Sequence, residues 1–185
     1  MKYANVLWAL ACLAASSFAL GETHNFIQLS YVEERPDAED ARPSGLGILA
    51  RYDIGEHIFI RGEIEDLEDK GVDVSGHALA LAYRLNPHDP IVIHAAAIVE
   101  HEDEEEDGNQ DHSLAKGGEI GFHAELGQRF VFHGEASAVY EKGDETLGLA
   151  LGMLFKLSEH LGANIELSRD NDRNEGMELG LRYSF

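Results

Sequence analysis

The sequence predicts an all-β fold: a ten-stranded antiparallel transmembrane β-barrel with short turns at one end and acidic loops at the other. The first observation is the segment from Glu175 to Phe185, in which apolar and polar residues alternate without a break, so that one face is wholly apolar. The second is that nine earlier segments show the same period of two. The third is that the connectors alternate between short and long, as transmembrane barrels require.

The first residues have the features of a secretory signal peptide. Lys2 is followed by an apolar core over residues 6–13 and by small residues over 14–19. That apolar core is shorter than the roughly 20 residues of a spanning helix, which disfavours a membrane anchor. A lipoprotein processed before Cys12 is also disfavoured, because the preceding residues suit that cleavage poorly and apolar chain follows. We therefore expect a signal peptide at 1–21 and one cysteine-free barrel domain at 22–185.

Ten segments have about the length of a tilted membrane strand, roughly 9–11 residues. Their expected limits are 25–34, 44–54, 57–67, 72–85, 90–101, 115–126, 129–141, 145–157, 160–169 and 175–185. Short connectors follow the even-numbered segments, at 55–56, 86–89, 127–128 and 158–159. Longer acidic connectors follow the odd-numbered ones, at 34–43, 68–71, 102–114, 142–144 and 170–174. The short set is predicted to form periplasmic turns and the acidic set outer loops.

The two faces of these segments differ in chemistry. The faces expected to meet lipid are uncharged, as at odd positions from Leu147 to Phe155. A charge facing lipid at mid-bilayer costs about 2–4 kcal/mol, so this segregation favours a membrane barrel. A soluble barrel is disfavoured because the opposite faces are mainly Gly, Ala, Glu, Arg and His, which cannot make a dry core. These faces predict a lumen network of Arg51, Arg61, Glu63, Arg84, Glu119, His123, His133, Glu135, Lys156, Glu166, Glu178 and Arg182.

The chain resembles the small outer-membrane β-barrel proteins of Gram-negative bacteria, the porin-family or outer-membrane-protein-A-like barrels. The resemblance covers the whole of 22–185 and is carried by the signal peptide, the ten alternating segments, acidic loops such as 170–174, and the closing residues 179–185. It implies an outer-membrane location, contact with lipid and lipopolysaccharide, and recognition of the last strand, ending in Phe185, by the barrel assembly machinery. It implies no particular activity, because the group includes adhesins, narrow pores and envelope-stabilising proteins.

The charge balance limits the partners. The chain has 14 basic and 35 acidic residues and a formal net charge of −21. Removing 1–21 removes one lysine and no acid, which leaves −22 on the barrel. Such a charge argues against nucleic acid and against anionic lipid without bridging cations. We expect a monomer without a cofactor.

The most acidic stretch lies between His101 and His112, in the longest expected outer loop. Its weak divalent-cation candidates are Glu102, Asp103, Glu104, Glu105, Glu106, Asp107 and Asp111. Oxygen-rich clusters bind Ca²⁺ or Mg²⁺, although the spacing matches no EF-hand. The plainer interpretation is a solvated loop that repels itself.

The ten histidines are scattered, but His94, His123 and His133 lie on three adjacent expected strands and face inward, which makes them candidates to lie close together. A hydrogen-bonded lumen is favoured over a metal or catalytic cluster, because imidazole and carboxylate pair in either protonation state. Ten-stranded proteases of the omptin type use a rim acid pair and an Asp–His pair, which have no clear match here, so no enzyme is expected. The predicted function is structural or surface interaction. A narrow, weakly cation-selective pore is the alternative, because ten strands lie near the filled end of the barrel series.

Overall fold

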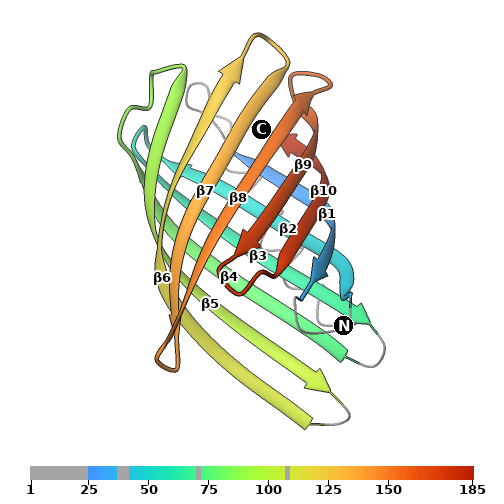
Figure 1. Cartoon of the computed structure of the whole chain (residues 1–185). Coiled ribbons are helices and arrows are strands. Elements are labelled where there is room, and N and C mark those ends of the chain that lie inside the picture. The colour runs from blue at the N-terminus through green and yellow to red at the C-terminus, as the bar shows by residue number, and fades with distance from the viewer. Residues whose placement is uncertain (1–24, 37–41, 70–71, 107–108) are drawn as a thin grey trace.

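The computed structural model describes residues 25–36, 42–69, 72–106 and 109–185, which form ten antiparallel strands closed into one barrel (Figure 1). In chain order these are β1 Phe26–Arg35, β2 Ser44–Ile54, β3 Ile58–Asp69, β4 Val72–Arg84, β5 Ile91–Glu106, β6 Asn109–Leu126, β7 Phe130–Glu141, β8 Asp144–Lys156, β9 Leu161–Asp170 and β10 Glu175–Ser184. Each strand pairs with the next, and β1 pairs with β10 to close the ring. No helix within the described ranges is long and apolar enough to cross a membrane. The expected signal peptide at 1–21 lies outside these ranges.

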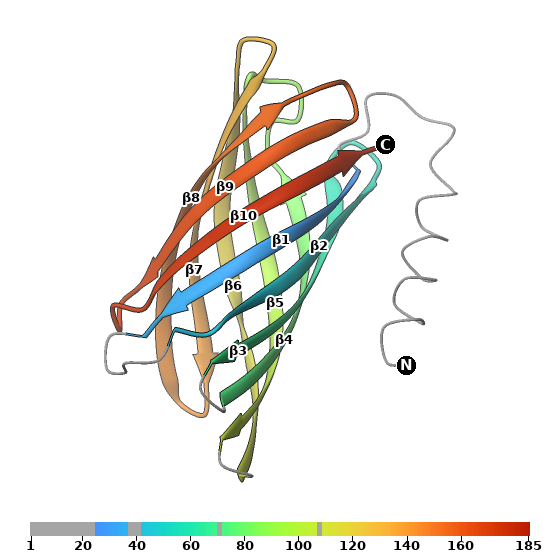
Figure 2. The ribbon, with the colours of Figure 1, turned by 90° about the vertical axis from the view of Figure 1, so that its right-hand side faces the viewer.

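Eight of the ten expected strands agree with the observed limits to within two residues. The exceptions are β5 and β6, which are five and six residues longer at their outer ends. The stretch expected as a loop at 102–114 is therefore a paired extension, and we call residues 101–106 with 109–114 the outer hairpin. It projects beyond the other hairpins (Figure 2). The expectation of a loop was wrong because acidic side chains in water do not prevent the backbone groups of two strands from pairing.

The outer surface is apolar, as the alternation predicts. Leu29, Leu81, Leu151 and Leu181 point outward and are more than half exposed, on four different strands. The fifth strand, which had apolar residues on both faces, is oriented by burial: Ile91 is exposed whereas its neighbour Val92 is buried. A closed ring with this outer band is a membrane-spanning fold, because no strand edge is left unpaired.

The interior contains more apolar side chains than the sequence pattern indicated. Phe59 and Leu67 are each 2% exposed, and Val32, Ile98 and Leu154 are also buried. All five alternate with outward-pointing neighbours and therefore point into the barrel. The expectation of an interior built mainly from small and polar residues was wrong in this respect. Ten strands enclose a lumen narrow enough for large side chains from different parts of the wall to fill it.

The first and last strands of the barrel pair with each other, and the start of β1 meets the end of β10 on the periplasmic side. Phe26 on β1 is opposite Ser184 on β10, and the Phe185 amide donates a hydrogen bond to the Asn25 carbonyl at 3.0 Å. The tight turn after β2 is at the same end, where Gly55 has a φ of 81°. This left-handed conformation favours glycine, which explains how so short a connector can reverse the chain.

Candidate functional site

The lumen contains a cavity of about 980 Å³. Its lining begins at the periplasmic turns, with Gln128 and Ser158, and continues along the wall to Glu63 and Glu178. Glu65 also points into the lumen, two residues beyond Glu63 toward the outer end of β3, but it does not line the cavity. The cavity therefore occupies the periplasmic part of the barrel, and the charged side chains along it form the candidate site.

A cluster of two arginines lies near the periplasmic end. Arg84 forms an ion pair with Asp53 and donates to the Glu56 carbonyl at 3.0 Å. Arg51 donates from Nε to the same Asp53 carboxylate at 3.3 Å. Both guanidinium groups lie over the Phe59 ring, at 3.8 Å for Arg51 and 5.1 Å for Arg84. Cation–π attraction and the shared carboxylate together hold two like charges side by side.

A second cluster spans the lumen. Arg61 on β3 donates to Glu119 on β6 and to Glu135 on β7, each at 2.6 Å. Strands β4 and β5 separate β3 from β6 in the wall, so these bonds cross the interior and do not follow the sheet. The Glu119 side chain is 2% exposed, and losing the partner of a charge at such a site is strongly destabilising. We call this contact the cross-lumen bridge.

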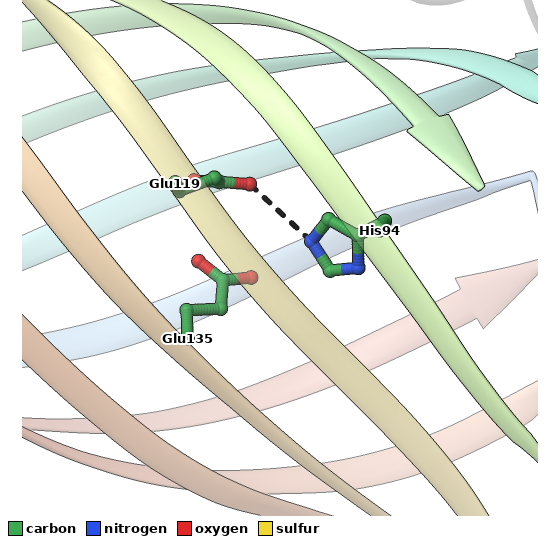
Figure 3. Close-up of side chains that lie close together, drawn as sticks. All are labelled: His94, Glu119 and Glu135. Carbon is green, nitrogen blue, oxygen red and sulfur yellow. Dashed lines mark ion pairs between the residues drawn. The ribbon is translucent and has the colours of Figure 1, made fainter. Parts of the chain in front are cut away.

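His94 on β5 lies beside the cross-lumen bridge. Its Nε2 atom is 3.4 Å from Oε1 of Glu119, and the Glu135 carboxylate lies close to both (Figure 3). The ring meets Phe59 edge-on, with 5.4 Å between centroids. The three inward histidines were expected to lie close together, but they do not form one site. His133 instead contacts Glu166, with 2.8 Å between Nε2 and Oε2, and His123 is opposite His133 in register.

The remaining predicted lumen residues also have partners or line the cavity. Lys156 donates to Glu125 at 2.8 Å near the mouth, and Arg182 donates to the Gln28 side chain at 2.9 Å. Glu178 accepts hydrogen bonds from Gln28 and Ser30. The predicted network omitted the neutral Gln28 and Ser30, along with Asp53. Their inward position in the alternation was the available signal. A search for charges passes over the amide of Gln28 and the hydroxyl of Ser30, and Asp53 was missed although it is charged.

The outer hairpin carries a separate polar cluster on its outer face. Asp103 accepts a contact from Nδ1 of His112 and lies 3.4 Å from Nε2 of His101. The hydrogen bond from His112, followed by the charge of His101, holds the pKa of Asp103 below its usual value. Of the cation candidates, Glu102 and Glu104 face inward and Asp103 and Glu105 outward, so they do not converge. Asp107 and the side chains of Glu106 and Asp111 lie outside the described part, and cation binding here stays a prediction.

No family model matches the sequence, and no curated protein matches it. Among solved structures, the chain is similar to the translocator domain of the autotransporter NalP from Neisseria meningitidis, with a TM-score of 0.53 at 11% identity over 99% of this chain and 96% of that chain. The KdgM porin in complex with disordered oligogalacturonate gives a TM-score of 0.48 at 12% identity over 85% and 99%. Neisserial surface protein A gives 0.45 at 12% over 90% and 100%.

The fold is that of an outer-membrane β-barrel. The full-length match to the NalP translocator domain and the closed ten-stranded ring confirm the predicted fold class. The outer-membrane location expected from the sequence agrees with this fold. At 11% identity the likeness concerns the fold alone, so the function has to be argued from the lumen and the outer hairpin of this chain.

Proposed function

We propose that the protein is a small outer-membrane barrel with a structural or surface-interaction role, whose lumen is closed by paired side chains. The observation that carries the proposal is the cross-lumen bridge. Arg61 crosses the interior to two carboxylates on β6 and β7, with both bonds at 2.6 Å. A charged side chain fixed at both ends across a narrow lumen obstructs it and links distant parts of the wall.

The packing further out supports the same conclusion. Beyond the cavity, Val32 and Leu67 are buried on the side of β1 and β3, and Ile98 and Val139 are buried on the side of β5 and β7. All four point into the barrel. Apolar side chains packed at this level narrow the lumen beyond the cavity, which supports a closed barrel over an open channel.

The surface role rests on the outer hairpin, which extends beyond the other hairpins at its end of the barrel (Figure 2). Seven carboxylates lie between His101 and His112, so this projection presents strong negative charge. Charge of this kind steers association with cationic partners or with cation-bridged lipopolysaccharide. At the other end of the barrel, the closing strand and Phe185 are the expected contact with the assembly machinery. We assign no catalytic residue.

The second candidate function is a narrow pore with weak cation preference. The cavity of about 980 Å³ favours it, because that volume holds many waters and opens toward the periplasm. Its lining carries Glu63, Glu166 and Glu178. With the inward Glu65 and Glu125 added to the predicted network, seven inward carboxylates stand against five inward bases. A conducting path would follow this cavity and pass the cross-lumen bridge.

Conductance across planar bilayers separates the two candidates. We expect the wild-type barrel to give no sustained ion current. Replacing Arg61 with glutamine removes the bridging charge and leaves two adjacent carboxylates that repel, so Arg61→Gln should produce measurable cation current. The matched control is Arg35→Gln, because Arg35 pairs with Glu33 at 2.9 Å on β1 and its side chain is 53% exposed. This control should behave like the wild type.

One result would contradict a lumen closed by the bridge. Steady single-channel current through the wild-type barrel, unchanged in Arg61→Gln, would show that the bridge does not close the lumen. The narrow pore would then be the better description. Heat-modifiable migration of each variant on gels verifies that the barrel is folded before current is compared.

A further inference from the structure

We propose that His94, Glu119 and Glu135 form a binding site for a divalent transition-metal ion, with Zn²⁺ as the probe. The three residues come from the adjacent strands β5, β6 and β7 and converge inside the barrel (Figure 3). One potential ligand atom from each lies within 4.8 Å of the other two. The proposal rests on this geometry and is independent of whether the barrel conducts.

The separation of two of these atoms fits a metal better than a hydrogen bond. His94 Nε2 and Glu119 Oε1 are 3.4 Å apart, whereas N–H···O bonds in proteins cluster at about 2.9–3.0 Å. Zinc holds imidazole nitrogen and carboxylate oxygen at about 2.0–2.2 Å in a tetrahedron, whose corners are then about 3.3–3.5 Å apart. A zinc ion shared by these two atoms therefore requires almost no movement of either side chain. A rotation of the more exposed Glu135 carboxylate brings in the third ligand.

These same two atoms are buried in the part of the barrel that the structure describes. The His94 side chain is 8% exposed and that of Glu119 is 2% exposed. Within the described residues, neither Nε2 of His94 nor Oε1 of Glu119 has a hydrogen-bond partner. Buried polar atoms are normally satisfied, because leaving one unpaired costs about 1–3 kcal/mol. A bound cation would satisfy both atoms at once.

Gly121 provides the space in which the ligands meet. It lies on β6, opposite His94 on one side and Glu135 on the other. A Cβ atom here would be 2.4 Å from Cε1 and 2.6 Å from Nε2 of His94, and 3.1 Å from Cγ of Glu135. Only glycine lets both side chains extend over β6 toward Glu119. The site thus depends on one residue that contributes no ligand.

The surroundings determine which ion fits. Arg61 bonds to Oε2 of Glu119 and to Oε1 of Glu135, which orients both carboxylates and leaves Oε1 of Glu119 available. Two carboxylates and one guanidinium leave a negative charge that attracts a dication. Calcium and magnesium favour six or more oxygen ligands, whereas a mixed set of one imidazole and two carboxylates suits zinc. His94 and Glu135 also line the cavity, so water can fill a fourth position.

The test uses the refolded barrel in detergent, stripped of metal and titrated with Zn²⁺ by calorimetry. His101 and His112 are first replaced by alanine, so that the outer hairpin cannot bind the probe. We expect one zinc ion per barrel. His94→Gln and Glu119→Gln should each weaken binding at least about tenfold. The matched control is His133→Gln, which removes another inward imidazole, the one paired with Glu166 at 2.8 Å, and should bind as before.

Two results would overturn the proposal. One is zinc binding that is unchanged in His94→Gln. The other is no zinc binding by the barrel in which only His101 and His112 have been replaced. A second measurement needs no lumen substitution and therefore covers the case in which a variant fails to fold. X-ray absorption at the zinc edge, measured on the variant in which only His101 and His112 are replaced by alanine, should show one imidazole among the groups bound to zinc. A shell with two or more imidazoles, or with none, would place the ion elsewhere and overturn the assignment.

Discussion

Replacing Leu151 with arginine tests the position of the lipid-facing band. Leu151 lies at the middle of β8, its side chain points outward and it is 54% exposed. An arginine at the bilayer midplane destabilises an outer-membrane barrel by about 2–4 kcal/mol. Since each 1.4 kcal/mol is tenfold in an equilibrium constant, the folding equilibrium should fall by roughly 30- to 700-fold.

The same strand supplies a control at a different depth. Leu147 lies on the same face of β8, four residues nearer the outer end, which is about 13 Å along the strand and about 9 Å along the membrane normal for a tilt of about 45°. Its backbone N–H donates a hydrogen bond to Oδ1 of Asn171, in the turn between β9 and β10, at 3.0 Å, which places Leu147 near the outer rim. Arginine there should cost only about 0–1 kcal/mol.

The assay is urea-dependent folding into phosphatidylcholine vesicles, followed by heat-modifiable migration on gels. The gel is preferred to intrinsic tryptophan fluorescence because the only tryptophan, Trp8, precedes the barrel. Equal costs for arginine at 147 and 151 would show that depth is irrelevant at these positions. Full tolerance of Leu151→Arg would show that this face of β8 does not meet hydrocarbon.

Two further predictions concern backbone packing and pH. Gly45→Ala should destabilise the barrel by about 1–3 kcal/mol in the same assay, because its Cβ would lie 1.9 Å from the Asp66 carbonyl oxygen. Gly62→Ala should be nearly neutral, since the added Cβ would lie 4.0 Å from the Ala78 carbonyl oxygen; equal effects would exclude a backbone clash as the cause. The lowered pKa of Asp103 means that its contact with His112 stabilises the outer hairpin above pH 3.8 and is lost as the pH falls through the lower native value. Amide exchange in the outer hairpin should rise in that acidic window, and Asp103→Asn should remove this step; an unchanged profile would show that the carboxylate is not responsible.

The strand pattern could be predicted because a membrane barrel imposes the same rule on every residue it spans. Outward side chains meet hydrocarbon and inward ones do not, so alternation in segments such as 175–185 directly reports the face. The rule stops at the membrane surface. Beyond it, both faces of the outer hairpin meet water, and composition no longer distinguishes a strand from a loop. The length of β5 and β6 was missed for this reason.

The inward direction of the charged residues could likewise be predicted, but their partners could not. Arg61 donates hydrogen bonds to Glu119 and Glu135, which lie 58 and 74 positions away in the chain. Sequence proximity would instead have suggested the inward Glu63 on the same strand. His94, expected near His123 and His133, instead lies against Glu119. Alternation gives one coordinate, in or out, whereas pairing also depends on height along the barrel and on the strand opposite.

Local periodicity and solvent preference were enough to predict the number of strands, their faces and the placement of short turns and acidic connectors. The folded barrel was needed to show which side chains meet across the lumen, where the cavity ends, and that His94, Glu119 and Glu135 converge over Gly121. Ring closure accounts for this difference. The tilt and register that close ten strands set the height of every inward side chain, and these quantities arise from all the strand pairs together.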